Sequence, residues 1–217
     1  MADDVVVVVW MSRYFSLGRV STGGSNENPL SEHPQLVPDG GGGGGEPALT
    51  IAHSWKCPTN DSAAKKAADV IKSTPSSYSQ EFSGALVQLS AGSFAISGNE
   101  LFSNGLNNGT GMVRGLVADV ARFQGSIHNH PRGRANADPA VDRYPSDAGW
   151  EGIDSLKVNR PEVDLSNFTI YIIDHSGDVR GFRYADKHLY PKNADIAARQ
   201  SGVNLPPIIN DSSGCHQ

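Results

Sequence analysis

The chain has 217 residues, a formal net charge of −5 and a pI near 5.8. A surface that binds nucleic acid needs clustered Lys and Arg, so this charge argues against nucleic acid as the main partner. The sequence contains no run of about 20 apolar residues, and no membrane span is therefore predicted. The length fits one ordinary domain with extensions.

The N-terminal part is expected to lie outside the folded domain. Residues 1–20 include an apolar run at 5–9. This run is too short for a secretory signal, and acidic residues precede it. We expect a β-strand there, either docked on the domain or left over from a larger assembly. Residues 21–48 are polar, carry prolines and include the six glycines Gly40–Gly45. This composition is typical of a flexible linker, and such a glycine run can be natural or engineered.

The segment 49–190 is expected to form the domain. Asn60–Lys72 predicts a helix, because Asn60 or Asp61 can cap it and lysines follow late in the segment. The other expected elements are strands at 82–89 and 93–97, a turn-rich loop at 99–110, a short helix at 113–123, a strand at 125–130, a helix from Ser146, and strands at 168–174 and 179–184. This mixture predicts an α/β or α+β sheet with helices packed against it.

The remaining segment, 191–217, is expected to be a tail. It is weakly helical around residues 194–200, and we expect disorder after that point. The two cysteines, Cys57 and Cys215, are too far apart in sequence for a zinc motif of the CxxC type. The sequence leaves open whether a single disulfide joins them.

The strongest chemical signal is a pair of histidines at the end of an apolar run, in Ile127-His-Asn-His-Pro131. On a strand, residues i and i+2 point to the same face. His128 and His130 can therefore reach one metal ion while Asn129 points away, and imidazole is a common zinc ligand. Pro131 ends the strand because it has no N–H to donate. The alternative is a structural pair of histidines, each hydrogen-bonded to backbone.

Two further motifs flank the histidines in a specific order. Glu81-Phe-Ser-Gly84 opens an expected strand upstream, and Tyr144-Pro-Ser-Asp147 begins an expected helix downstream. Together with His128-Asn-His-Pro131 they resemble the JAB/MPN family of zinc metalloproteases with the JAMM motif, over roughly residues 60–190. They are also similar to the bacterial JAB-like domains of Rhs-type and other polymorphic toxins. The resemblance implies a JAB/MPN-like mixed β-sheet flanked by helices, which is a cytidine-deaminase-like fold.

The resemblance also implies a mechanism. His128 and His130 would bind Zn²⁺, with Asp147 as the candidate third ligand, and the metal would lower the pKa of a bound water to about 7. Glu81 would take the proton of that water and pass it to the leaving amine. Ser146 would donate a hydrogen bond to the oxyanion, although Pro-Ser-Asp is also a good helix cap. In the family the substrate is an amide or isopeptide bond.

One position departs from the family motif. The aspartate ligand of the family falls three residues after the serine, where this chain has Gly149. Asp147 lies two residues earlier, and two residues turn a helix by about 200°. Asp138, Asp142 and Asp154 are further candidates. Either a nearby carboxylate substitutes, or a ligand is missing and the metal is weakly held, or the chain has lost its activity.

The resemblance therefore implies a zinc-dependent hydrolase of amide or isopeptide bonds. The resemblance implies a bacterial secreted effector or toxin domain, made in the bacterial cytoplasm and then exported or delivered to a target cell. Its partners would be a protein or peptide substrate and, for a toxin, an immunity protein. A peptidoglycan peptide hydrolase is a related possibility. The alternative from another class is a catalytically impaired JAB-like module that binds a protein, and Gly149 favours it.

Overall fold

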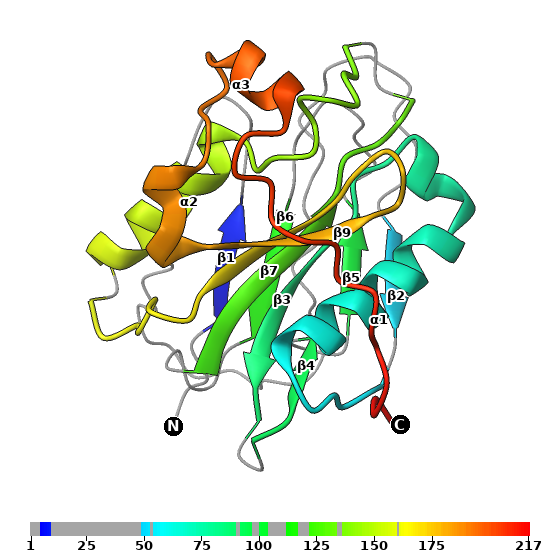
Figure 1. Cartoon of the computed structure of the whole chain (residues 1–217). Coiled ribbons are helices and arrows are strands. Elements are labelled where there is room, and N and C mark those ends of the chain that lie inside the picture. Colours follow the sequence, from blue (N-terminus) through cyan, green and yellow to red (C-terminus); the bar gives the residue numbers. More distant parts are fainter. Residues whose placement is uncertain are drawn as a thin grey trace, which may run out of the picture.

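The structure is a computed structural model of the chain. It describes residues 5–9, 49–52, 54–89, 92–96, 100–103, 112–116, 122–133, 136–159 and 161–217. A mixed β-sheet with flanking helices makes the described part an α+β fold, which confirms the predicted class (Figure 1). The expected linker at 21–48 lies outside the described residues.

The main sheet has the strand order β2–β5–β3–β7–β8–β9, with β4 paired to β3. Only β7 and β8 run parallel among these pairs, and α2 lies between them in the chain. The strands are β2 (Leu49–Ala52), β3 (Ser83–Gln88), β4 (Phe94–Ile96), β5 (Glu100–Ser103), β7 (Phe123–Asn129), β8 (Thr169–Ile173) and β9 (Val179–Arg183). A separate antiparallel pair joins β1 (Val5–Val9) to β6 (Met112–Leu116), so the expected N-terminal strand is confirmed.

The helices are α1 (Asn60–Ser73), the 3-10 turn η1 (Pro75–Tyr78), α2 (Asp147–Asn159), the 3-10 segment η4 (Tyr184–Leu189) and α3 (Ile196–Ser201).

The prediction that Asn60 or Asp61 caps α1 is wrong. Thr59 is the N-cap, and Ser62 N donates to Thr59 Oγ1 (3.0 Å) in a capping box. Asn60 donates instead to Gln124 O (3.1 Å), which ties α1 to β7.

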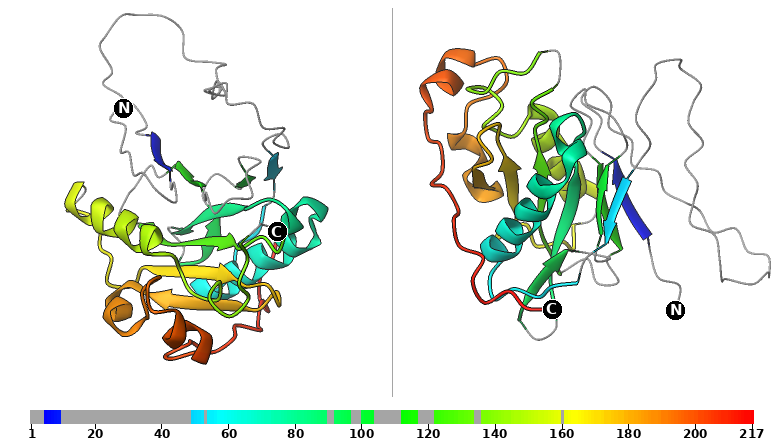
Figure 2. Two further views of the ribbon diagram at one scale, coloured as in Figure 1. Left: turned by 90° about the horizontal axis from the view of Figure 1, so that it is seen from above. Right: turned by 90° about the vertical axis from the view of Figure 1, so that its right-hand side faces the viewer.

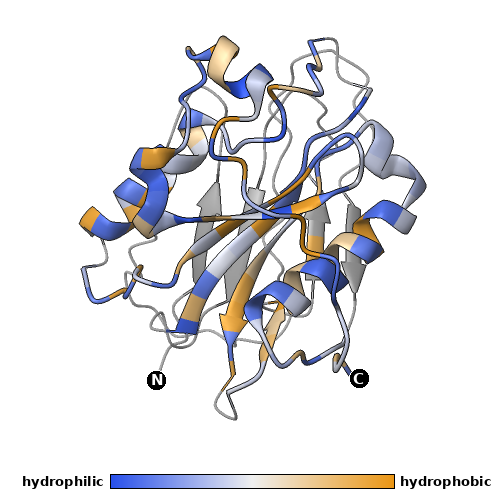
Figure 3. Ribbon diagram, in the orientation of Figure 1, coloured by the Kyte–Doolittle hydropathy of each residue, from blue (hydrophilic) through white to orange (hydrophobic). Residues whose placement is uncertain are grey.

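Each face of the sheet is covered by one long helix. On one face the alanines of α1 pack with Leu86 and Ile127. On the other face Trp150 and Ile153 of α2 pack with Ile170, among other apolar residues. In Figure 3, β3 is largely hydrophobic, whereas α1 carries both hydrophobic and hydrophilic residues, as a helix with one buried side requires.

Two of the expected elements are wrong. The predicted helix at 113–123 is replaced by β6 and by the start of β7, because residues 112–116 pair with β1 and the apolar spacing is equally compatible with an extended chain. Within the predicted loop at 99–110, residues 100–103 form β5 and pair with β2. Strand pairing, which is a long-range interaction, decides both cases. The β3–β4 and β8–β9 hairpins are confirmed.

The C-terminal segment is ordered, so the expected disorder after residue 200 is wrong. Ile209 N donates to Val179 O (2.8 Å), and Cys215 forms a disulfide with Cys57. The segment crosses β9 and then follows α1 to the C-terminus (Figure 1), and both views of Figure 2 place it on the outer side of β9. These long-range contacts, and not the local composition, order the tail.

No helix in the described part of the chain combines the length and apolar character that crossing a membrane needs.

One buried arginine joins the C-terminal segment to the loop in front of α2. Arg199 on α3 is 2% exposed. Its guanidinium donates to Val141 O (3.1 Å), to Pro145 O (2.7 Å) and to Pro191 O (3.2 Å). Five N–H donors in a fixed fork suit arginine to such a cluster of carbonyls. The position of Ser146 and of the start of α2 therefore depends on a residue more than 50 positions later in the chain.

Candidate functional site

The pairing of β3 with β7 brings three of the predicted site residues together. In this antiparallel pair Ser83 lies opposite His128. Asn129 N also donates to Phe82 O (3.2 Å), so the same register continues beyond β3 and sets Glu81 opposite His130. Residues that face each other across an antiparallel pair point to the same side. Glu81, Ser83, His128 and His130 therefore share one face of the sheet.

This shared face is the one that α2 covers. Ala85, two residues after Ser83, packs in the same apolar cluster as Trp150 and Ile153 of α2. Glu81 is 5% exposed and His130 is 8% exposed, so both lie at the buried edge of this layer. The side of the sheet that carries the histidines is thus the side that α2 covers, and Ser146 lies directly before α2.

His130 is held in one orientation by the loop in front of α2. Its Nδ1 lies 2.5 Å from the main-chain oxygen of Asp142. Because a carbonyl oxygen only accepts, Nδ1 carries the proton and donates it. In a neutral ring Nε2 then carries the lone pair with which imidazole binds a metal. Metal-binding histidines are commonly oriented in this way, because the ring nitrogen that does not bind the metal donates to an acceptor such as a backbone carbonyl.

His128 is neutral over the physiological pH range. Its side chain is only partly exposed, and burial together with the neighbouring His130 lowers the pKa of His128 to about 3. The two ring centres are 5.1 Å apart. Two imidazoles on one tetrahedral zinc, each bound at about 2.0–2.1 Å, would have ring centres roughly 5 Å apart. The spacing of the two rings and the neutral state of His128 therefore both fit a shared metal ion.

Asn129, between the two histidines, points to the opposite face and holds the chain that carries Glu81. Its Oδ1 accepts from Phe82 N (2.6 Å), and its Nδ2 donates to Ser77 O (3.0 Å) and Gln80 O (3.1 Å). The side chain is 5% exposed. One amide group thus satisfies three main-chain groups on both sides of Glu81, and it positions Glu81 relative to β7.

The two site residues predicted at the start of α2, Ser146 and Asp147, differ in their contacts. Ser146 Oγ accepts from Gly149 N (3.1 Å) and caps the helix. A hydroxyl that accepts a hydrogen bond still has its own hydrogen to donate. Asp147, in contrast, is joined to Asn193: Asp147 Oδ1 accepts from Asn193 N (3.0 Å), and Asn193 Oδ1 accepts from Asp147 N (3.3 Å). The carboxylate of Asp147 therefore faces the segment before α3, and no contact in the described structure joins it to the histidines.

The other candidate carboxylates also have defined partners. Asp154 accepts from Tyr184 Oη (2.9 Å) and pairs with Lys187. Asp138 Oδ1 accepts from Ala140 N (2.9 Å) within its own turn. Asp142 is 5% exposed, and its main-chain oxygen contacts His130 Nδ1.

The side chain of Asp142 lies beside a third histidine. Asp142 Oδ2 is 3.3 Å from His175 Nε2, and both side chains are nearly buried. His175 sits in the turn between β8 and β9, which Asp174 stabilises by accepting from Ser176 N (2.8 Å). From the sequence alone we assign no chemical role to His175, because a single histidine in a turn belongs to no motif. Its proximity to Asp142 follows from the fold.

The donor atoms fit zinc in type and spacing, although the set is incomplete. Among the described residues, no three His, Cys, Asp or Glu side chains come together to hold a metal ion. His128 and His130 would supply two ligands, and a water or a rearranged carboxylate such as that of Asp142 would have to complete the site. The role of Asp147 as a third ligand stays a prediction without support from its contacts.

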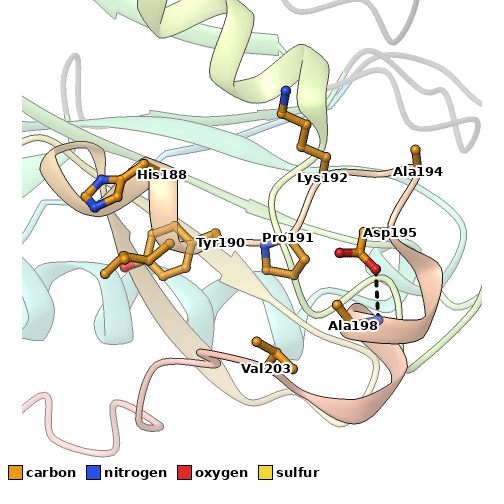
Figure 4. Close-up of a pocket in the computed structure, with 9 residues that line it drawn as sticks. His188, Tyr190, Pro191, Lys192, Ala194, Asp195, Ala198 and Val203 are labelled. Carbon is orange, nitrogen blue, oxygen red and sulfur yellow. Dashed lines mark hydrogen bonds between the residues drawn. The ribbon is translucent and has the colours of Figure 1, made fainter.

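A pocket in the described structure lies away from these residues. It has a volume of about 610 Å³ and is lined by residues of η4 and α3 and of the segments next to them (Figure 4). His188 and Lys192 contribute to its lining, and Asp195 accepts from Ala198 N (3.2 Å) to cap α3. None of the predicted site residues lines it. We therefore place the candidate site at the histidines, on the chemistry of the side chains.

No protein-family model, no curated protein and no solved structure matches this chain. The interpretation of the site therefore rests on its residues and their geometry.

Replacing Asn129 by Ala tests its role in holding the segment around Glu81. Three main-chain groups would lose the Asn129 amide, two of them in buried hydrogen bonds, and we expect the free energy of unfolding to fall by about 2–4 kcal/mol. Urea denaturation of the metal-free protein measures this loss. Gln200→Ala, at an exposed position on α3, serves as the control and should change little. Equal stabilities of Asn129→Ala and the unaltered protein would contradict the assignment.

The low pKa of His128 predicts a pH dependence of stability in metal-free protein. In the unfolded chain this histidine binds a proton below about pH 6.5, whereas in the folded chain it does so only near pH 3. Protonation therefore favours the unfolded state, and stability should fall as the pH drops through this window, by at most about 1.4 kcal/mol per pH unit.

Denaturation at pH 7, 6 and 5 measures this slope. His128→Gln should flatten it, and His188→Gln, on an exposed side chain of η4, should not. A slope that is the same in His128→Gln as in the unaltered protein would show that His128 is not shielded in the folded state.

Proposed function

We propose that this chain is a zinc-dependent hydrolase of amide or isopeptide bonds, of the JAMM type. The observation that carries the proposal is the shared face of β3 and β7, which presents Glu81 beside His128 and His130. The hydrogen bond from His130 Nδ1 to Asp142 O, which orients the ring and places the lone pair of a neutral ring on Nε2, supports it further. The separation of 5.1 Å between the imidazole rings is the third supporting feature.

In this proposal each side chain has a defined task. Zinc, when bound, makes a hydroxide available near neutral pH. Glu81, buried beside the histidines, accepts the proton of the attacking water and passes it to the leaving amine. Ser146 donates its hydroxyl hydrogen to the oxyanion of the substrate while Gly149 N holds its oxygen in place. Asp142 keeps His130 oriented through its carbonyl.

A secreted effector or toxin domain remains the proposed context. The disulfide between Cys57 and Cys215 supports it, because disulfides form and persist in oxidising compartments outside the cytoplasm. In that context the chain would be made in the bacterial cytoplasm and would meet a protein or peptide substrate after export. An immunity protein would be needed in the cell that makes it.

A JAB-like module that binds a protein without catalysis is the second candidate. It is favoured by Gly149 at the position of the family aspartate and by the engagement of Asp147 with Asn193. The two candidates differ in one property that can be measured, which is hydrolysis that depends on Glu81.

Glu81→Gln keeps the shape of the side chain and removes its basicity. In zinc-loaded protein we expect this change to lower the rate of amide hydrolysis by about 10²–10⁴-fold without loss of zinc. Glu151→Gln, the same substitution at an exposed position on α2, should leave the rate unchanged. Ubiquitin-like chains and muropeptides are assayed in parallel, because they separate an isopeptidase from a peptidoglycan peptidase. Hydrolysis that is equal in Glu81→Gln and the unaltered protein, or absent from both, would contradict the proposal.

A further inference from the structure

A buried hydroxyl next to the candidate site is not accounted for by the roles above. Ser83 is 1% exposed and lies directly opposite His128 in the β3–β7 pair. Within the described part of the chain, Ser83 Oγ is buried and makes no hydrogen bond. Buried hydroxyls are nearly always hydrogen-bonded, because losing contact with water without a replacement costs free energy. This atom therefore calls for a partner from outside the described protein atoms.

The position of Ser83 shows where such a partner would lie. Ser83 is two residues from Glu81 on the same strand end, so both side chains point toward the α2 side of the sheet, as His128 and His130 do. Opposite residues of an antiparallel pair have Cβ atoms roughly 4.5–5.5 Å apart. A water or small oxygen ligand bound by His128 would thus lie within reach of the Ser83 hydroxyl.

The next position on β3 offers Ser83 no polar partner. The next residue on the same face of β3 is Ala85, which is fully buried in the apolar cluster of α2. On β3, the polar part of this face is therefore limited to Glu81 and Ser83, whereas on β7 the buried Ser126 lies opposite Ala85. Ser83 is thus the innermost polar residue of β3 on this face.

We infer that Ser83 is a binding residue of the site, whose hydroxyl hydrogen-bonds to the water held between His128, His130 and Glu81. This role rests on the proposed function, because it assumes that the two histidines hold a metal with its water. The hydroxyl can accept from the water and can donate to it, so it can orient the water whichever hydrogen Glu81 accepts.

The test uses Ser83→Ala and measures cobalt binding and stability. Co²⁺ is titrated into metal-free protein and followed by its visible absorption. If Ser83 orients the metal-bound water, Ser83→Ala should weaken Co²⁺ binding by about 10-fold, which is the lower end of the loss seen when outer groups of metal sites are removed. In the metal-free state the variant should unfold at the same or a higher urea concentration, because a buried hydroxyl without a partner has been removed.

Ser126→Ala is the matched control, since Ser126 is buried on β7 two residues before His128 and lies opposite Ala85. This variant should bind Co²⁺ as the unaltered protein does. Equal Co²⁺ affinity of Ser83→Ala and the unaltered protein would overturn the role of Ser83 and leave the proposed function intact. A lower stability of metal-free Ser83→Ala would also overturn it, because the hydroxyl would then have a structural partner. Failure of the unaltered protein to bind Co²⁺ would overturn both.

Discussion

The antiparallel register of β3 against β7 is the constraint on which the candidate site depends. It sets Ser83 opposite His128, and its continuation sets Glu81 opposite His130. A slip by one residue would move every side chain of one strand to the other face. Asn129 opposes such a slip, because its amide binds Phe82 N, Ser77 O and Gln80 O on the α1 side. The motif His-Asn-His thus combines the two proposed metal ligands on one face with an amide that fixes the main chain on the other.

The second half of the site depends on contacts that come from the end of the chain. Arg199 fixes the main chain at Val141 and Pro145, which flank the Asp142 carbonyl that orients His130. The C-terminal segment is in turn held by its pairing with β9 and by the disulfide to Cys57. The tail is therefore part of the structure that supports the site.

Much of the fold and part of the site were predictable from the sequence because their signals are local. Strand alternation predicts that His128 and His130 share a face, and Pro-Ser-Asp predicts the start of α2 at Ser146. Gly84 of the Glu81 motif has a packing reason, since a Cβ there would lie 2.8 Å from Leu101 Cδ2. Three features were not predictable, because each depends on residues distant in sequence: the hydrogen bonds between Asp147 and Asn193, the pairing of β5 with β2 and of β6 with β1, and the order of the tail.

The central claim is that His128 and His130 together hold one zinc ion. It is tested most directly by elemental analysis of the purified protein after equilibration with zinc and removal of the excess, beside His128→Ala. The account predicts about one zinc per chain in the unaltered protein and its loss in His128→Ala, with the fold retained. No bound zinc in the unaltered protein, or an equal amount in the variant, would contradict it.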